Sequence, residues 1–113
     1  MNQKKIMFKT HNKVLILNIF EILYFSADGN YSTIKMKSEK KHLVSIHLKS
    51  IEKQLPPFIF FRCHKSWIIN LNFVKEICQN QSCSVVLENN EKIKVSDRKT
   101  TELKKALQLF CSF

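Results

Sequence analysis

The chain has 113 residues, of which 44% are hydrophobic and 25% charged, a balance that excludes a disordered protein and allows one hydrophobic core. Lysine and arginine outnumber acidic residues 19 to 9, and the net charge of +10 is spread along the whole chain. This excess indicates either an A/T-biased genome rich in lysine codons or a surface for nucleic acid or an anionic membrane. The longest apolar run, 14–25, contains Asn18 and Glu21 and is therefore excluded as a membrane span.

The cysteines and the N-terminus point to the cytoplasm. Only three apolar residues, 6–8, follow the basic N-terminus, too few for a signal peptide. The four cysteines contain no CxxC pair, and no histidine stands at zinc-finger spacing. We therefore expect reduced thiols and neither a metal nor a cofactor. A disulfide between Cys78 and Cys83 across a turn is the alternative.

The first half of the chain is predicted to form antiparallel strands. Because the whole chain has one glycine and two prolines, most turns must be made by Asn, Asp, Ser and charged residues. Apolar and polar residues alternate in 31–37, which puts Ser32 and Ile34 on one face of a half-buried strand and Lys35 on the other. The predicted strands are 6–9 and 14–18, which form a hairpin, then 22–26, 31–37 and 40–45, with turns at 27–30 and 38–39.

Two helices are predicted in the second half. A helical spacing of leucine and isoleucine in 47–55 ends at Pro56 and Pro57, and a second amphipathic pattern runs through Leu103, Leu107 and Phe110. Five strands are predicted between these helices, at 58–63, 66–69, 74–78, 83–87 and 92–96. The fold class is therefore mainly β: a single domain over residues 1–113, an antiparallel arrangement of small sheets with one short internal helix and a C-terminal helix.

Catalysis is not supported by the sequence. The nine acidic residues are scattered, and no pair is placed for general acid–base chemistry. Cys63 and His64 are neighbours on a predicted strand, so their side chains point to opposite faces, with Cys63 in the core. A phosphate-binding loop needs glycines that this chain lacks. We therefore predict a binding protein and not an enzyme.

The predicted binding chemistry lies at strand ends. Segment 60–70 reads FFRCHKSWIIN and places Arg62, His64, Lys65 and Ser66 almost side by side between apolar runs. Burying such a row is costly unless each group is paired, so we expect it to face a polyanion.

Two further polar segments, 28–32 and 96–99, also border predicted strands. Arg62 and Arg98, the two arginines of the chain, both lie in segments of this kind. A plain turn is the alternative interpretation of 28–30. For His64 the alternative is a half-buried side chain that holds its loop.

Segment 60–70 resembles the F-x-R-x-H-x-S-x-x-x-N signature of the LytTR family, the DNA-binding output domain of bacterial response regulators. Further blocks of the chain are similar to that family in the same order, so that the resemblance covers about residues 6–109. These blocks are the strand 22–25 with the turn 28–31, the helix 48–55, and the strands 74–77, 85–87 and 93–96.

The resemblance implies a fold that reads double-stranded DNA with loops set into successive major grooves, often at directly repeated sites bound by two copies. It implies base contacts by Ser32, Lys65 and Arg98, and phosphate-contacting or loop-shaping roles for Asn30, Tyr31, Ser66 and Lys99, with His64 either touching DNA or holding its loop. It also implies a cytoplasmic transcriptional regulator, away from membranes, that answers to a sensor or receiver partner.

Two departures from the family pattern bear on these roles. Asp97 stands where a basic residue is usual, and we expect it to cap the following helix. No receiver domain precedes the signature, so the chain is either a stand-alone regulator or an excised output domain, and Met1 favours the first. A basic module that docks RNA or protein without sequence-specific duplex binding remains the alternative function.

Overall fold

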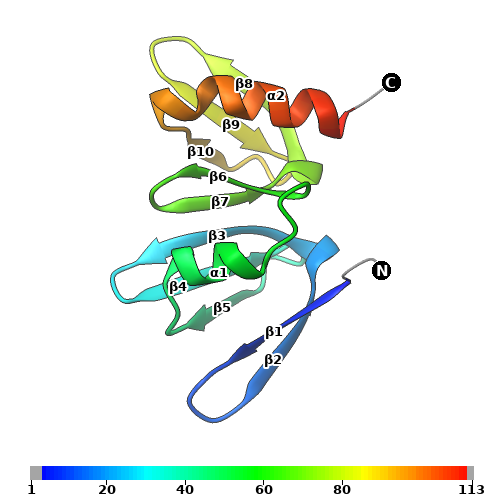
Figure 1. Cartoon of the computed structure of the whole chain (residues 1–113), viewed down its shortest axis with the longest axis vertical. Helices are drawn as coiled ribbons and strands as arrows, with labels where there is room; N and C mark the ends of the chain where they lie inside the picture. Colours follow the sequence, from blue (N-terminus) through cyan, green and yellow to red (C-terminus); the bar gives the residue numbers. More distant parts are fainter. Residues whose placement is uncertain (1–3, 112–113) are drawn as a thin grey trace.

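The part of the chain that the computed structural model describes, residues 4–111, consists mainly of antiparallel strands (Figure 1). The predicted fold class is confirmed, and the ends of each predicted strand and of the internal helix lie within two residues of the observed ends. The predicted C-terminal helix is also present, and it begins at Thr100, three residues before Leu103. The elements are β1 (Lys5–Lys9), β2 (Val14–Asn18), η1 (Ile19–Glu21), β3 (Ile22–Asp28), β4 (Tyr31–Met36), β5 (Lys41–Val44), α1 (Leu48–Gln54), β6 (Phe60–His64), β7 (Trp67–Asn70), η2 (Leu71–Phe73), β8 (Val74–Gln79), β9 (Cys83–Leu87), β10 (Lys92–Lys94), η3 (Asp97–Lys99) and α2 (Thr100–Phe110), where η marks a single turn of 3-10 helix.

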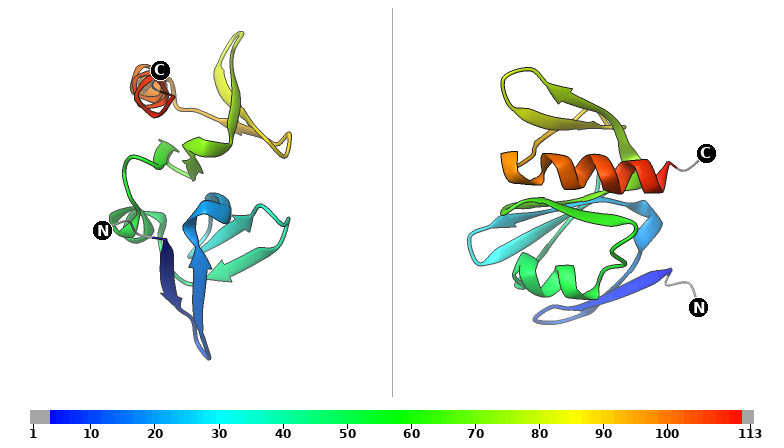
Figure 2. Two further views of the ribbon diagram at one scale, coloured as in Figure 1. Left: turned by 90° about the vertical axis from the view of Figure 1, so that its right-hand side faces the viewer. Right: turned by 45° about the horizontal axis from the view of Figure 1, so that its top comes forward.

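The strands form three antiparallel sheets. A hairpin of β1 and β2 makes the first, the order β5-β4-β3-β7-β6 makes the second, and β10-β9-β8 makes the third. Figure 2 shows the five-stranded sheet in the middle, with the β1–β2 hairpin at one end of the molecule and the three-stranded sheet with α2 at the other. The central strand β3 is consequently buried on both faces, which explains why residues 22–25 are all apolar and all buried.

Two hydrophobic cores hold the sheets together. The first lies between the hairpin, α1 and the five-stranded sheet, where the ring of Phe25 meets those of Phe8 and Phe60 edge to face, with centroids 6.0 and 5.8 Å apart. The second lies between the five-stranded sheet, the three-stranded sheet and α2, and it contains Leu103 and the thiol of Cys63, as predicted. Burial raises the pKa of Cys63 to about 12, so this thiol stays protonated.

The turns follow the shortage of glycine. Gly29 begins the two-residue β3–β4 turn with a φ of 62°, a conformation that suits glycine. Two other turns place Glu39 and Asn90 at φ values of 74° and 72°, so a charged residue and an asparagine take the left-handed positions, as the composition predicted. All four cysteines are free thiols, and Cys78 faces Ser84 across its hairpin, so the alternative of a Cys78–Cys83 disulfide is wrong.

Lys35 departs from the alternating pattern. It was expected on the wet face of β4, but the residue is buried, and its ammonium pairs with Glu39 at 2.8 Å and with Glu91 at 3.4 Å. The hydroxyl of Tyr24 also donates to Glu91, at 2.9 Å. Burial alone would raise the pKa of Glu91, but these hydrogen bonds and the charge of Lys35 lower it. This cluster therefore joins the five-stranded sheet to the three-stranded sheet.

None of the helices in the described part of the chain is long and apolar enough to cross a membrane.

Candidate nucleic-acid interface

Two turns of the five-stranded sheet and the segment that follows the three-stranded sheet lie along one side of the molecule. The β3–β4 turn, the β6–β7 turn and the start of α2 lie on the left in Figure 1, above the β1–β2 turn. Backbone hydrogen bonds join the first three: the amide of Ala27 donates to the carbonyl of Ser66 at 2.9 Å, and the amide of Ser96 donates to that of Cys63 at 2.8 Å. The three polar segments singled out in the sequence, 28–32, 64–66 and 96–99, are thus brought together by the fold.

The β3–β4 turn presents two of the predicted contact residues. Asn30 and Tyr31 are both exposed, and Tyr31 shows 49% of its surface although it is a large aromatic residue. The turn is short because Asp28 pairs directly with Tyr31 across the hairpin. Both side chains therefore stand at the tip of a rigid hairpin.

Ser32 does not fit the prediction of a base contact. It is completely buried, and its hydroxyl donates a hydrogen bond to the carbonyl of Ile46. In this position the hydroxyl ties β4 to the segment that precedes α1 and offers no atom to a partner. The alternation of β4 had already placed Ser32 on the face of Ile34, which is also buried.

The row of polar groups in segment 60–70 is divided by the fold. Arg62 is half-buried and paired: its guanidinium contacts a carboxylate oxygen of Glu52 at 2.8 Å and donates to the carbonyls of His64 at 3.0 Å and Lys65 at 2.6 Å. The expectation that the whole row faces a polyanion is therefore wrong for Arg62. Its positive charge is compensated inside the protein.

His64 holds its own turn. Its Nδ1 accepts a hydrogen bond of 3.1 Å from the backbone amide of Ser66, which requires that nitrogen to be unprotonated. Burial lowers the pKa of His64, and the charges of Lys94 and Lys65 lower it further. The arrangement agrees with the alternative in which His64 shapes the loop.

Lys65 and Arg98 carry free charge at the interface. Both side chains are exposed, and among residues 4–111 neither forms an ion pair. Lys65 occupies the two-residue β6–β7 turn, and Arg98 lies in η3 just before α2. Each can reach an incoming anion without first breaking a contact.

The residues beside Arg98 are more constrained. The ammonium of Lys99 lies 3.5 Å from a carboxylate oxygen of Glu102 and 6.0 Å from the centre of the Phe61 ring, so Lys99 is partly engaged in shaping the start of α2. Asp97 was expected to cap a helix. Ser96 occupies the cap of η3 instead, and Asp97 is an exposed residue in the first turn of η3. A negative charge is also favourable at this position, because the N-terminal end of a helix carries a partial positive charge.

Comparison with known proteins identifies this arrangement. The LytTr DNA-binding domain family matches residues 12–108. The chain belongs to this family. It is 30% identical over 99 residues to the heme-containing CO-sensing transcriptional regulator RcoM 1 of Paraburkholderia xenovorans, a match that covers 85% of the chain and 37% of the relative. It is 29% identical over 109 residues to the sensory transduction protein LytT of Bacillus subtilis, a match that covers 95% and 45%.

The fold is also that of a solved LytTr DNA-binding domain from Bacillus cereus. The TM-score is 0.78 at 24% sequence identity, with 94% of this chain and 98% of that chain covered. The chain spans less than half the length of RcoM 1 and LytT.

Within this LytTr domain, most of the 60–70 signature builds the scaffold. Phe60 lies in the first core, and the fully buried Asn70 accepts a hydrogen bond from the amide of Asn72 and donates to the carbonyls of Ile19 and Ile22. Sequence reasoning assigned no role to Asn70, nor to Glu52 as the partner of Arg62. The available signal for Asn70 was its place directly after the apolar run 67–69, because an asparagine buried beside such a run normally has hydrogen-bond partners. No local signal pointed to Glu52, which lies ten positions before Arg62.

Proposed function

We propose that this LytTr domain binds double-stranded DNA sequence-specifically and acts as a transcriptional regulator. The observation that carries the proposal is the meeting of the β3–β4 turn, the β6–β7 turn and η3 along one side, with the charges of Lys65 and Arg98 uncompensated. An exposed guanidinium can pair with the two acceptors of guanine in the major groove, and an ammonium can reach guanine or phosphate.

The dimensions support contact with more than one groove. The molecule measures 44 Å along its longest axis, and the turns follow one another along that axis in Figure 1. One turn of B-DNA measures about 34 Å, so a molecule of this length can lie along one face of the duplex from one major groove to the next. Asn30, Tyr31, Ser66 and Lys99, at the same side, are assigned to phosphate contacts or to the shape of the turns, and His64 to the shape of its turn.

The net charge supports the same partner. The excess of ten positive charges favours association with a polyanion and predicts affinity that falls steeply with salt. Two copies on directly repeated sites, and control by a sensor or receiver, are supported by the family resemblance.

Selection of bound duplexes from a random pool tests the proposal. A single motif should be enriched, and its binding should persist in an excess of random competitor duplex. If the enriched pool shows no sequence preference at any salt concentration, sequence-specific regulation is refuted, and the chain is a basic docking module.

Two substitutions then locate the contacts. Arg98→Ala should cost about 1–3 kcal/mol of binding free energy and relax the preference at one position of the motif. Lys65→Ala should weaken binding to the same order of magnitude. Lys40→Ala is the matched control, because Lys40 is exposed at the opposite end of β4 from the β3–β4 turn. An equal loss on all sequences with Arg98→Ala would assign this residue to phosphate.

A further inference from the structure

We propose that Arg62 is a positioning residue, which contacts no DNA and holds the β6–β7 turn in the shape that presents Lys65. This inference rests on the proposed function only where it concerns Lys65 and DNA. The fixing of the turn by Arg62 is a property of the free protein and can be measured there.

The guanidinium joins two consecutive carbonyls of one turn. Its Nε donates to the carbonyl of His64 at 3.0 Å and its Nη2 to the carbonyl of Lys65 at 2.6 Å. The two carbonyls belong to the peptides that flank Lys65, so the fork fixes the backbone on both sides of the residue whose side chain is free. A planar group with donors in fixed directions can make this clamp, and an ammonium on a flexible stem cannot hold both directions.

The side chain of Arg62 is poorly placed to contact DNA directly. It is 22% exposed, and its remaining charge faces Glu52 at 2.8 Å. A phosphate that approached the guanidinium would meet the carboxylate of Glu52 at the same place. Contact with DNA would therefore require breaking an ion pair that already satisfies the arginine.

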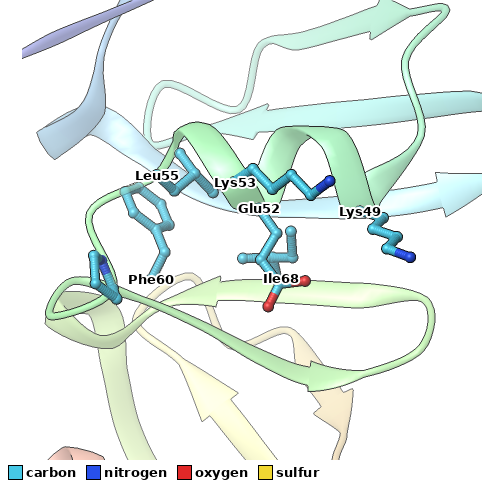
Figure 3. Close-up of a pocket in the computed structure, with 7 residues that line it drawn as sticks. Lys49, Glu52, Lys53, Leu55, Phe60 and Ile68 are labelled. Atoms are coloured by element: carbon cyan, nitrogen blue, oxygen red, sulfur yellow. The ribbon is translucent and has the colours of Figure 1, made fainter.

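Glu52 extends the clamp to the internal helix. Figure 3 shows its side chain leaving α1 and pointing towards the β6–β7 hairpin, in a groove that it lines together with the apolar residues Leu55, Phe60 and Ile68. These residues line a groove of about 410 Å³ between α1 and the hairpin. The carboxylate therefore links α1, through Arg62, to the turn that carries Lys65, and a shift of α1 would pull on that turn.

The turn is also tied at its second residue. The carbonyl of Ser66 accepts from the amide of Ala27 at 2.9 Å, and its own amide donates to Nδ1 of His64 at 3.1 Å. The backbone pairing of His64 with Trp67 closes the hairpin, and Arg62 adds hydrogen bonds to the two carbonyls on the Lys65 side of the turn. Loss of the fork should loosen this side of the turn and leave the hairpin paired.

Amide hydrogen exchange in the free protein tests the clamp without DNA. Arg62→Lys keeps the charge and removes the fork, and it should accelerate exchange of the Ser66 amide at least fivefold while the amides in the middle of β3 stay protected. Glu52→Gln should produce a smaller acceleration in the same place. Glu88→Gln is the matched control, since Glu88 is exposed in the turn after β9 and forms no ion pair in the described chain. Unchanged exchange of Ser66 in both variants at Arg62 and Glu52 would overturn the inference.

A double-mutant cycle tests the link to Lys65. On the selected duplex, Arg62→Lys should weaken binding about tenfold with the salt dependence unchanged, and it should add nothing to Lys65→Ala, because the effect passes through Lys65. A loss that adds fully to that of Lys65→Ala would mean that Arg62 acts on DNA by itself, and the inference would fail. If no duplex is selected at all, the proposed function fails, and the exchange experiment still decides whether Arg62 holds the turn.

Discussion

Removal of the Asn70 side chain should destabilise the protein more than its single cap position suggests. Asn70 ends β7 with a completely buried side chain. Its Oδ1 accepts from the amide of Asn72 at 2.9 Å and so caps η2, while its Nδ2 donates to the carbonyl of Ile22 at 2.9 Å and to that of Ile19 at 3.4 Å. One amide therefore joins β7 to η1 and the start of β3.

The chain contains a natural control for the capping part of this effect. Asn18 caps η1 in the same way, with Oδ1 accepting from the amide of Phe20 at 2.9 Å, but it is only half-buried, and within residues 4–111 its side chain makes no further hydrogen bond. Loss of an Asn cap costs about 1 kcal/mol, which is the expected cost of Asn18→Ala. Asn70→Ala loses a cap and also removes the hydrogen bond to the buried carbonyl of Ile22, so about 2 kcal/mol more is expected. The carbonyl of Ile19 loses only the long contact of 3.4 Å and keeps the hydrogen bond from the amide of Ile22.

Urea denaturation followed by the fluorescence of Trp67, the single tryptophan, measures both variants. Asn70→Ala should lower the free energy of unfolding by about 3 kcal/mol with an unchanged m value, and its melting temperature should fall by about 12 °C. The refuting result is an Asn70→Ala cost no larger than that of Asn18→Ala. The carbonyl of Ile22 would then be satisfied by water, and the buried amide would contribute only its cap.

Three further predictions concern the turns and the thiols. The pKa of His64 is lowered from its ordinary 6.5, so the unfolded chain binds this proton at a higher pH than the folded protein does. The free energy of unfolding should therefore decrease as the pH falls below 6.5. His64→Gln should reduce this dependence in thermal denaturation measured over a series of pH values. With a thiol reagent, the exposed Cys111 should react in the native protein and the buried Cys63 only after unfolding, which mass spectrometry of the labelled peptides would resolve. Gly29→Ala has space for its Cβ but not the positive φ, so it should cost about 1 kcal/mol in denaturation, and Gly29→Asn clearly less.

The strands were predictable because their signal is local. Alternation and turn residues located the β1–β2 hairpin, β4 and β9, and the helical spacing located α1 and its end before Pro56. The same local pattern misplaced Lys35, because its ammonium is covered by Glu39 from the next turn and by Glu91 from the hairpin of another sheet. A period of two reports which face a residue occupies, and it carries no information on whether a distant carboxylate will cover that face.

The site was predictable only in part for the same reason. The sequence picked out three segments that the fold does bring together, yet it could not separate side chains that point outward from those that hold a turn. Arg62 and Lys65 are both basic and lie three positions apart, but Glu52 pairs with the first and nothing in the described chain pairs with the second. Ser32 was chosen from its place in a motif although its own strand pattern put it inside.

Scaffold and proposed recognition are therefore divided within one short segment. The side chains of Arg62, His64 and Asn70 form hydrogen bonds within the protein itself. The exposed side chain of Lys65 forms none within the described residues. A polar side chain that is already satisfied inside has little to gain from DNA, because each contact made there breaks one made in the protein. Recognition must then fall on the exposed positions of the turns, where a substitution changes what is bound and leaves the fold intact.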